Sequence, residues 1–279
     1  MLITAAEARV YIPARTGTGD DATVIEPLIK RAGHLLAARC GYPGEAPTME
    51  SATYVLDLAA RDSRDLDLEV YPVASVTSAY VDSTGDYEGQ EETVTVADIG
   101  IRRGRVARLL SSSSSSWSTS PSGNRITFVA GFGGSSTLNG AISSTSATTI
   151  TVTSTAAFWL DSSGRGRALI DSEIVHFTGK TSTTLTGCTR GAEGTTAATH
   201  LTGATITSPV PEGLKELCAR LVRHLYDMRE TQGKASIATG QGGSVSLKEF
   251  RWGTKSDYTL IPPDIEAELG AYILPRAAA

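Results

Sequence analysis

Cysteine, aromatic residues and long apolar runs are all scarce in this sequence of 279 residues. Its three cysteines, Cys40, Cys188 and Cys218, are far apart and form no CxxC pair, so we expect reduced thiols and no disulfide framework. No run of 18 or more apolar residues occurs, and no basic segment followed by an apolar one opens the chain. We therefore expect neither a membrane span nor a secretion signal, and synthesis in the cytoplasm.

An excess of positive charge is also missing. The chain has 25 Lys and Arg against 30 Asp and Glu, a net charge of -5, whereas tight binding to phosphate backbones needs clustered cations. Sequence-specific DNA binding is therefore not expected. Arg102, Arg103, Arg105 and Arg108 do cluster in the sequence. They fit either a nucleic-acid patch or the charged edge of a hairpin over 101–110, and we favour the hairpin because edge charges suppress aggregation between sheets.

Recognisable catalytic motifs are absent. The sequence contains no G-x-S-x-G, no H-E-x-x-H and no G-x-G-x-x-G after a strand, and its four histidines are widely spaced. Asp171, Glu173, His176 and His200 have the chemistry of metal ligands, but His176 is expected to alternate with apolar neighbours on a strand. We therefore predict no enzymatic activity, no cofactor, and no catalytic, cofactor-binding or metal-binding residue.

The clearest positive signal is a helix over 210–233. Leu214, Leu217, Leu221 and Leu225 belong to an apolar stripe with steps of three and four residues, opposite a charged face;. Pro209 or Pro211 suits the first turn of this helix, and Gly233 suits its end.

Three further helices are indicated nearer the ends of the chain. Thr4 and Glu7 form a capping box ahead of a short helix over 5–11;. Thr23 and Glu26 form a second box, with Thr23 as the cap of a helix that ends at Gly41. A last short helix is predicted from Pro263 through 269–272.

Between these helices the pattern changes to that of β-structure. Strands are predicted over 53–58, 65–70, 75–82 and 124–132, together with the hairpin over 101–110;. Residues 133–208 contain only short alternating segments and turn signals, which predicts a compact meander or small barrel with a glycine-rich loop at 190–194. Because strand signals stop where the 210–233 helix begins, we predict a host domain of 1–132 and 209–279 interrupted by an inserted β domain of 133–208. The expected class is α+β, with a helical bundle core, a small β-sheet region and the inserted all-β domain.

The order of these segments resembles the head-tail connector (adaptor) proteins of long-tailed bacteriophages, the gp6-like family. The segments that carry the resemblance are Leu2–Tyr11, Asp20–Tyr42, Arg125–Phe132, Val210–Glu230 and Ile261–Tyr272. Residues 133–208 depart from the family pattern and are similar to small β modules of other phage structural proteins.

The resemblance implies a structural virion protein at the head-tail junction, the neck of the particle. It implies a homo-oligomeric ring of about twelve copies, which contacts the portal protein and a stopper or tail-completion protein and lets genomic double-stranded DNA pass without sequence specificity. A negative channel would let DNA slide during packaging and ejection. Residues Val245–Trp252 are predicted to form a strand that pairs with another subunit. The expected subunit or portal interface residues are Arg220, Arg223, Asp227, Arg229, Val245, Leu247, Phe250 and Trp252.

Two other functional classes fit parts of the sequence. A head-closure or tail-completion (stopper) protein of the same neck would contain more β-structure and fewer helices. A surface protein that binds carbohydrate or a host receptor through the 133–208 module would present aromatic side chains in its loops. The only aromatic residues in that module, Phe158, Trp159 and Phe177, are instead expected in a core or a small edge patch.

Overall fold

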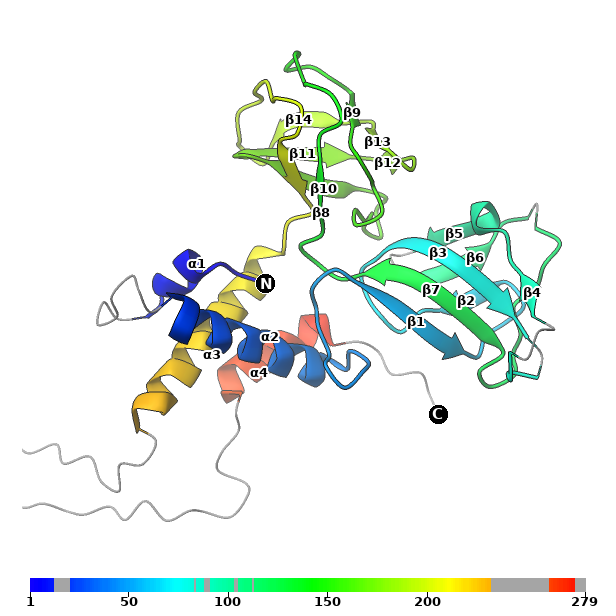
Figure 1. Ribbon diagram of the computed structural model, residues 1–279, viewed down its shortest axis with the longest axis horizontal. Helices are drawn as coiled ribbons and strands as arrows, with labels where there is room; N and C mark the ends of the chain where they lie inside the picture. Colours follow the sequence, from blue (N-terminus) through cyan, green and yellow to red (C-terminus); the bar gives the residue numbers. More distant parts are fainter. Residues whose placement is uncertain are drawn as a thin grey trace, which may run out of the picture. The chain divides into compact units, whose positions relative to one another are not determined.

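The computed structural model describes residues 1–12, 21–82, 84–87, 91–102, 105–111, 113–231 and 261–273. The chain divides into two compact units (Figure 1). Unit 1 joins the two ends of the sequence, Met1–Cys40 and Glu212–Ile273, and unit 2 is built from the segment between them, Gly41–Pro211. None of the described helices is both long and apolar enough to cross a membrane.

Unit 1 contains the α-helices of the described chain. Its helical elements are α1 (Ala5–Arg9), a π-helical turn η2 (Asp21–Ile25), α2 (Glu26–Cys40), α3 (Glu212–Thr231), α4 (Pro263–Leu269) and a 3-10 turn η4 (Gly270–Tyr272). The predicted capping box is present at α1, where the Glu7 backbone N–H donates to Thr4 Oγ1 at 3.2 Å and the Thr4 N–H donates to Glu7 Oε2 at 2.7 Å;. The second predicted cap is wrong, because the helical turns start at Asp21 and place Thr23 inside them.

The apolar stripe of α3 forms the centre of unit 1. Leu214 and Leu221 are fully buried, and α3 packs against α2 with further contacts to α1 and α4. Ion pairs at the rim join the same elements: Lys215 of α3 lies 3.1 Å from Glu7, and Arg39 of α2 donates to Glu266 of α4 at 2.6 Å. The early and late helices of the sequence therefore share one core.

The first part of unit 2 consists of two antiparallel sheets. Its strands are β1 (Ala52–Leu58), β2 (Asp65–Asp67), β3 (Val73–Val81), β4 (Glu92–Thr93), β5 (Ile99–Arg102), β6 (Val106–Leu109) and β7 (Asn124–Ala130), with a 3-10 turn η3 (Val96–Asp98). One sheet has the order β1-β7-β3-β4, and the other has the order β2-β6-β5. β7 alternates buried and half-buried residues, with Ile126 and Phe128 fully buried. The predicted hairpin over 101–110 is confirmed by the antiparallel pairing of β5 with β6.

The second part of unit 2 falls within residues 133–208. Its strands are β8 (Ser135–Thr137), β9 (Thr149–Thr151), β10 (Gly166–Ile170), β11 (Glu173–Phe177), β12 (Gly179–Lys180), β13 (Thr184–Thr186), β14 (Thr189–Ala192) and β15 (Thr205–Thr207). They form sheets of order β14-β11-β10-β15-β8 and β12-β13-β9. Part of the predicted glycine-rich loop at 190–194 is strand β14 instead.

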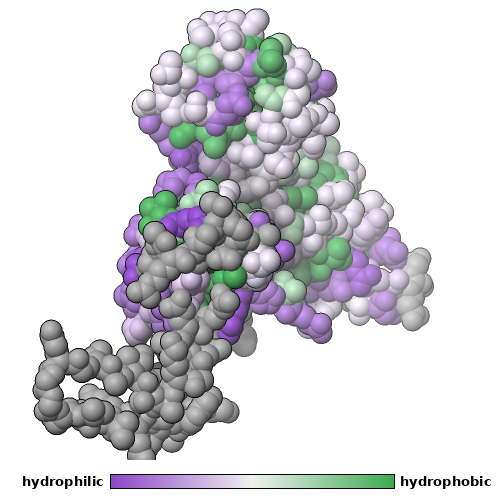
Figure 2. Space-filling view, turned by 60° about the vertical axis from the view of Figure 1, so that its left-hand side comes forward, coloured by the Kyte–Doolittle hydropathy of each residue, from purple (hydrophilic) through white to green (hydrophobic). Residues whose placement is uncertain are grey.

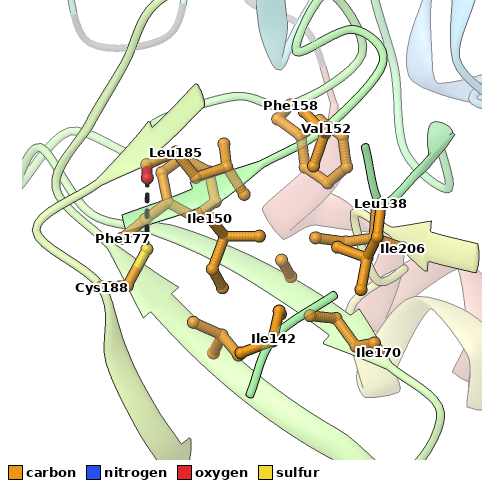
Figure 3. Close-up of a cluster of buried hydrophobic side chains, with 12 residues drawn as sticks. Leu138, Ile142, Ile150, Val152, Phe158, Ile170, Phe177, Leu185, Cys188 and Ile206 are labelled. Atoms are coloured by element: carbon orange, nitrogen blue, oxygen red, sulfur yellow. Dashed lines mark hydrogen bonds between the residues drawn. The ribbon is translucent and has the colours of Figure 1, made fainter. Parts of the chain in front are cut away.

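These strands enclose a hydrophobic cluster of their own (Figure 3). Phe158 and Phe177 meet edge to face in it, with ring centroids 6.3 Å apart. Its buried members are Leu138, Ile142, Ile150, Val152, Phe158, Ala168, Ile170, Val175, Phe177, Leu185, Cys188 and Ile206. A core made only from this stretch is what an inserted domain needs, and the division at 133 and 208 remains a proposal because unit 2 also includes the preceding sheets.

The predicted fold class is wrong. The described residues contain four sheets, and their α-helices occur only in unit 1, so this part of the chain is mostly β and contains no helical bundle core. The reason lies in residues 52–130, where apolar side chains recur with a period of two and build complete sheets;. These strands are a major part of the fold and not a small addition to a set of helices.

Replacing Gly166 by Ala should destabilise the 133–208 core. A Cβ at this position in β10 would lie 2.0 Å from Cζ of Phe177, which is fully buried on the paired strand β11. Overpacking of this kind costs about 1–3 kcal/mol. We expect Gly166→Ala to lower the urea midpoint of unfolding, while Gly270→Ala, where a Cβ meets nothing within 4 Å, should leave it unchanged. Equal midpoints for the two variants would contradict this packing.

Candidate functional site

Three of the predicted interface residues are placed on α3, where they bond within the chain. Arg220 donates to Glu268 at 2.9 Å and also to Asp264, both on α4. Arg223 donates to the carbonyl of Tyr11 at 3.1 Å and lies 3.5 Å from Asp227. These contacts fix α3 against α4 and against the residues that follow α1.

The remaining predicted interface residues lie outside the described part. They are the side chain of Arg229 and the residues Val245, Leu247, Phe250 and Trp252. The interface role of the whole set stays a prediction.

The most elaborate polar site is buried in the 133–208 module. Glu173, 1% exposed, starts β11 on the same face as the core residues of that strand. Its carboxylate accepts two hydrogen bonds from Arg190, both at 2.7 Å, and the backbone N–H groups of Gly191 at 2.9 Å and Ala198 at 3.0 Å. Arg190 also donates to the carbonyls of Ser144 at 2.9 Å and Ala198 at 2.5 Å. One ion pair thus holds β11, β14 and the chain that follows β14 together.

His200 completes this network. Its Nε2 lies 2.8 Å from Glu173 Oε2 and its Nδ1 lies 2.8 Å from Asp171 Oδ2, and the side chain is 2% exposed. A carboxylate oxygen only accepts hydrogen bonds, so both contacts are satisfied when both ring nitrogens carry hydrogen. The positive charge of Arg190 offsets the buried charge of Glu173;.

Burial raises the pKa of Glu173, but hydrogen bonds from Arg190, Ala198, His200 and Gly191 together outweigh it and hold the pKa at about 2;. The carboxylate is therefore ionised at neutral pH. Glu173 is the centre of a structural clamp, because every hydrogen bond described for its carboxylate comes from a group of the 133–208 module itself.

Three of these residues are recognisable in the sequence, but their spacing there does not indicate a clamp. Asp171, Glu173 and His200 were weighed only as metal ligands, and the fourth candidate, His176, is elsewhere. Among the described residues no group of three or more His, Cys, Asp or Glu is arranged to hold a metal ion. The signal that could have revealed the clamp is the alternation of β11, which places Glu173 on the buried face with Val175 and Phe177 and so requires a cationic partner;.

His176 lies on the outer face of the same sheet, as its alternation predicts. Its Nε2 is 2.8 Å from Glu193 Oε1, and Glu193 also accepts from Arg167 Nε at 2.7 Å. Hydrogen bonds from Arg167 have the largest effect on Glu193 and lower its pKa. Burial opposes them less strongly, and a hydrogen bond from His176 lowers the pKa further. This exposed cluster links β10, β11 and the end of β14.

Lys180 ties the 133–208 module to the sheet of β3. Its Nζ donates to the carbonyls of Ala74 at 2.6 Å, Thr155 at 3.1 Å and Phe158 at 2.5 Å. Burial lowers the pKa of this ammonium to about 8;. Trp159 packs nearby, edge-on to both Tyr71 and Phe132 at 6.0 Å.

The described aromatic side chains of the 133–208 module offer no stacking surface for a glycan. Phe158 and Phe177 are buried and Trp159 packs on other rings, as expected, so these aromatic side chains form no exposed stacking platform. A hollow of about 180 Å³ lined by residues 139–144, 147 and 149–151 has no charged side chain. On the face shown in Figure 2, apolar residues form small separate patches.

Comparison with known proteins gives weak structural likenesses, including two chains from gene transfer agent particles. No protein-family model and no curated protein matches the chain. A chain from the "neck of empty GTA particle computed with C6 symmetry" matches with 24% identity and a TM-score of 0.32, over 47% of this chain and 66% of that one. A chain from the "virion of native gene transfer agent (GTA) particle" matches with 25% identity, the same TM-score and the same coverage. This chain thus spans just under two thirds of each, and a TM-score of 0.32 does not establish a shared fold.

Acid should unfold the chain partly through Glu173. Its folded pKa is depressed from 4.5 to about 2, so its contribution to stability is full above about pH 4.5 and is lost as the pH falls towards 2. A shift of this size corresponds to about 3 kcal/mol. We expect the free energy of unfolding, measured with urea, to fall more steeply between pH 5 and pH 2 than in Glu173→Gln. Parallel curves for the two proteins would contradict the clamp.

Removing Arg220 should release α4. Its partners are exposed, with side chains 63% and 56% accessible for Asp264 and Glu268, so Arg220→Ala should cost less than about 1 kcal/mol overall. Hydrogen exchange of the α4 amides should nevertheless accelerate severalfold. Arg31→Ala, which removes an exposed α2 arginine with no partner in the described part of the chain, is the control. Unchanged α4 exchange in Arg220→Ala would refute this role.

Proposed function

We propose that this chain is a structural protein in the neck of a tailed bacteriophage or a related particle, where it forms an adaptor ring between the portal and the tail. The observation that carries the proposal is which segments of the chain come together in unit 1. Four of the five segments that resemble adaptor proteins, Leu2–Tyr11, Asp20–Tyr42, Val210–Glu230 and Ile261–Tyr272, fall almost entirely within this unit, although about 170 residues separate the second from the third.

The distribution of charge suits passive contact with DNA. Arg105 and Arg108, two of the clustered arginines, pair with Asp67 at 2.6 Å and Asp65 at 3.4 Å. Arginines neutralised in this way, on a chain of net charge -5, do not hold phosphates by releasing counterions. A ring of such subunits therefore lets DNA slide during packaging and ejection.

The partners follow from the same proposal. The ring contacts itself, the portal protein and a stopper or tail-completion protein, and genomic DNA passes through it. Its place is the virion neck, after synthesis in the cytoplasm of the host bacterium. One of the gene transfer agent chains described above also belongs to a neck, but a likeness at that TM-score adds no weight.

A stopper or tail-completion protein of the same neck is the second candidate. The observation in its favour is the β content, since four sheets and a small helical unit are closer to what such a protein needs. Chemical cross-linking in the assembled particle separates the two: an adaptor cross-links to the portal, whereas a stopper cross-links to the tail side and to a separate adaptor.

Deleting the gene from the particle-producing strain tests the neck assignment. We expect DNA-filled or DNA-leaking heads and free tails in electron micrographs, with tailed particles restored by the wild-type gene supplied in trans. Tailed, infectious or transducing particles formed at the normal yield without the protein would contradict the proposal.

A further inference from the structure

Among the described strands, β1 leaves one edge of its sheet without a partner. In the order β1-β7-β3-β4 it is a terminal strand, and it pairs with β7 over all seven of its residues. Phe132, just after β7, donates its N–H to Met49 on the β1 side, whereas Gly131 donates to Pro72 and Gly123 accepts from Asp82, both on the β3 side. Even-numbered residues of β7 therefore bond to β1.

The register then shows which groups of β1 are free. Ala52, Tyr54, Leu56 and Leu58 lie opposite the even-numbered residues of β7 and bond to them. The N–H and C=O groups of Thr53, Val55 and Asp57 consequently point away from β7, towards the open edge. Within the described residues these backbone groups have no hydrogen-bond partner. Three donors and three acceptors are thus available at the spacing of a strand.

This edge has few of the features that normally prevent pairing. β1 is seven residues long and contains no proline, and its one charged residue, Asp57, is paired across the sheet with Arg125 at 2.8 Å;. Val55 is 59% exposed. On the inner face Tyr54 and Leu56 are only partly buried, whereas Phe128 and Ile126, opposite them on β7, are fully buried. The core of the sheet is therefore incompletely covered along β1.

We propose that the edge of β1 is an acceptor for a strand from a second copy of this chain, and that the strand is Val245–Trp252. Main-chain hydrogen bonds to Thr53, Val55 and Asp57 would give affinity. Apolar side chains of the added strand, from among Val245, Leu247, Phe250 and Trp252, would cover the inner face at Tyr54 and Leu56.

The sequence between α3 and α4 supports this occupant. Residues 232–260 separate Thr231 from Ile261, and the eight residues Val245–Trp252 match the length of β1. The 13 residues from 232 to 244 are rich in Gly, Ser and Ala and can span up to about 45 Å. The choice of a second copy as the donor rests on the proposed ring. A ring with head-to-tail contacts needs both an acceptor edge and a separate donor strand on each subunit.

A labelled peptide of residues 243–254 tests the acceptor directly. Fluorescence anisotropy with the full-length chain should show saturable binding. Val55→Pro removes an outward N–H that the β7 pairing does not use, and proline is tolerated at such an edge position. We expect at least tenfold weaker peptide binding to Val55→Pro and unchanged binding to Val55→Thr, which keeps the N–H.

Hydrogen exchange gives a second readout that needs no variant. The amides of Thr53, Val55 and Asp57 in the wild-type chain should exchange more slowly when the peptide is present. Equal binding by Val55→Pro, or exchange at these amides unaffected by the peptide, would overturn the proposal. Protection already complete in a monomer, and unchanged on dilution, would overturn the second copy as donor.

These measurements test the strand pairing independently of the neck assignment. Peptide binding uses purified protein alone, so its loss together with tail-less particles in the deletion strain refutes only the strand pairing. Peptide binding with normal particles in that strain refutes only the neck function.

Discussion

The apolar stripe of α3 must be covered, and the residues that cover it come from the opposite end of the chain. Leu214 and Leu221 are fully buried against a unit whose other helices include α1 and α2. This requirement brings residue 40 and residue 212 into one unit, so the intervening chain has to leave and return to it. The intervening segment can then carry β-structure of considerable size without altering how α3 packs on α1 and α2.

Unit 2 meets a different constraint, which is the cost of burying charge. Glu173 sits on the core side of β11, and burial alone would favour its neutral form;. Arg190, His200 and two backbone N–H groups supply the compensation. Lys180 shows the same principle where the module meets β3, since backbone carbonyls surround its ammonium group. Polar clamps, together with the hydrophobic cluster, therefore determine how these strands are held.

Local structure was largely predictable from the sequence, whereas the proportion of helix to sheet in the fold was not. The stripe of α3, the capping box at Thr4 and most strands follow from periodicity and turn chemistry. The helical bundle core was wrong because the short strand patterns of residues 52–130, which build complete sheets, were given too little weight. The Glu173 clamp depends on contacts 17 to 27 residues away in sequence, and the pairing of Arg220 with α4 spans more than 40. Spacing alone does not specify such contacts, although the buried position of Glu173 could have been inferred from its strand.

The most direct measurement of the central claim is a reconstruction of the complete native particle at side-chain resolution, focused on the head-tail junction. The account predicts copies of this chain in a closed ring around the DNA exit, each with α1, α2, α3 and α4 in one unit. Copies found singly, on the capsid surface or at the tail tip, or no copies in the neck at all, would contradict it.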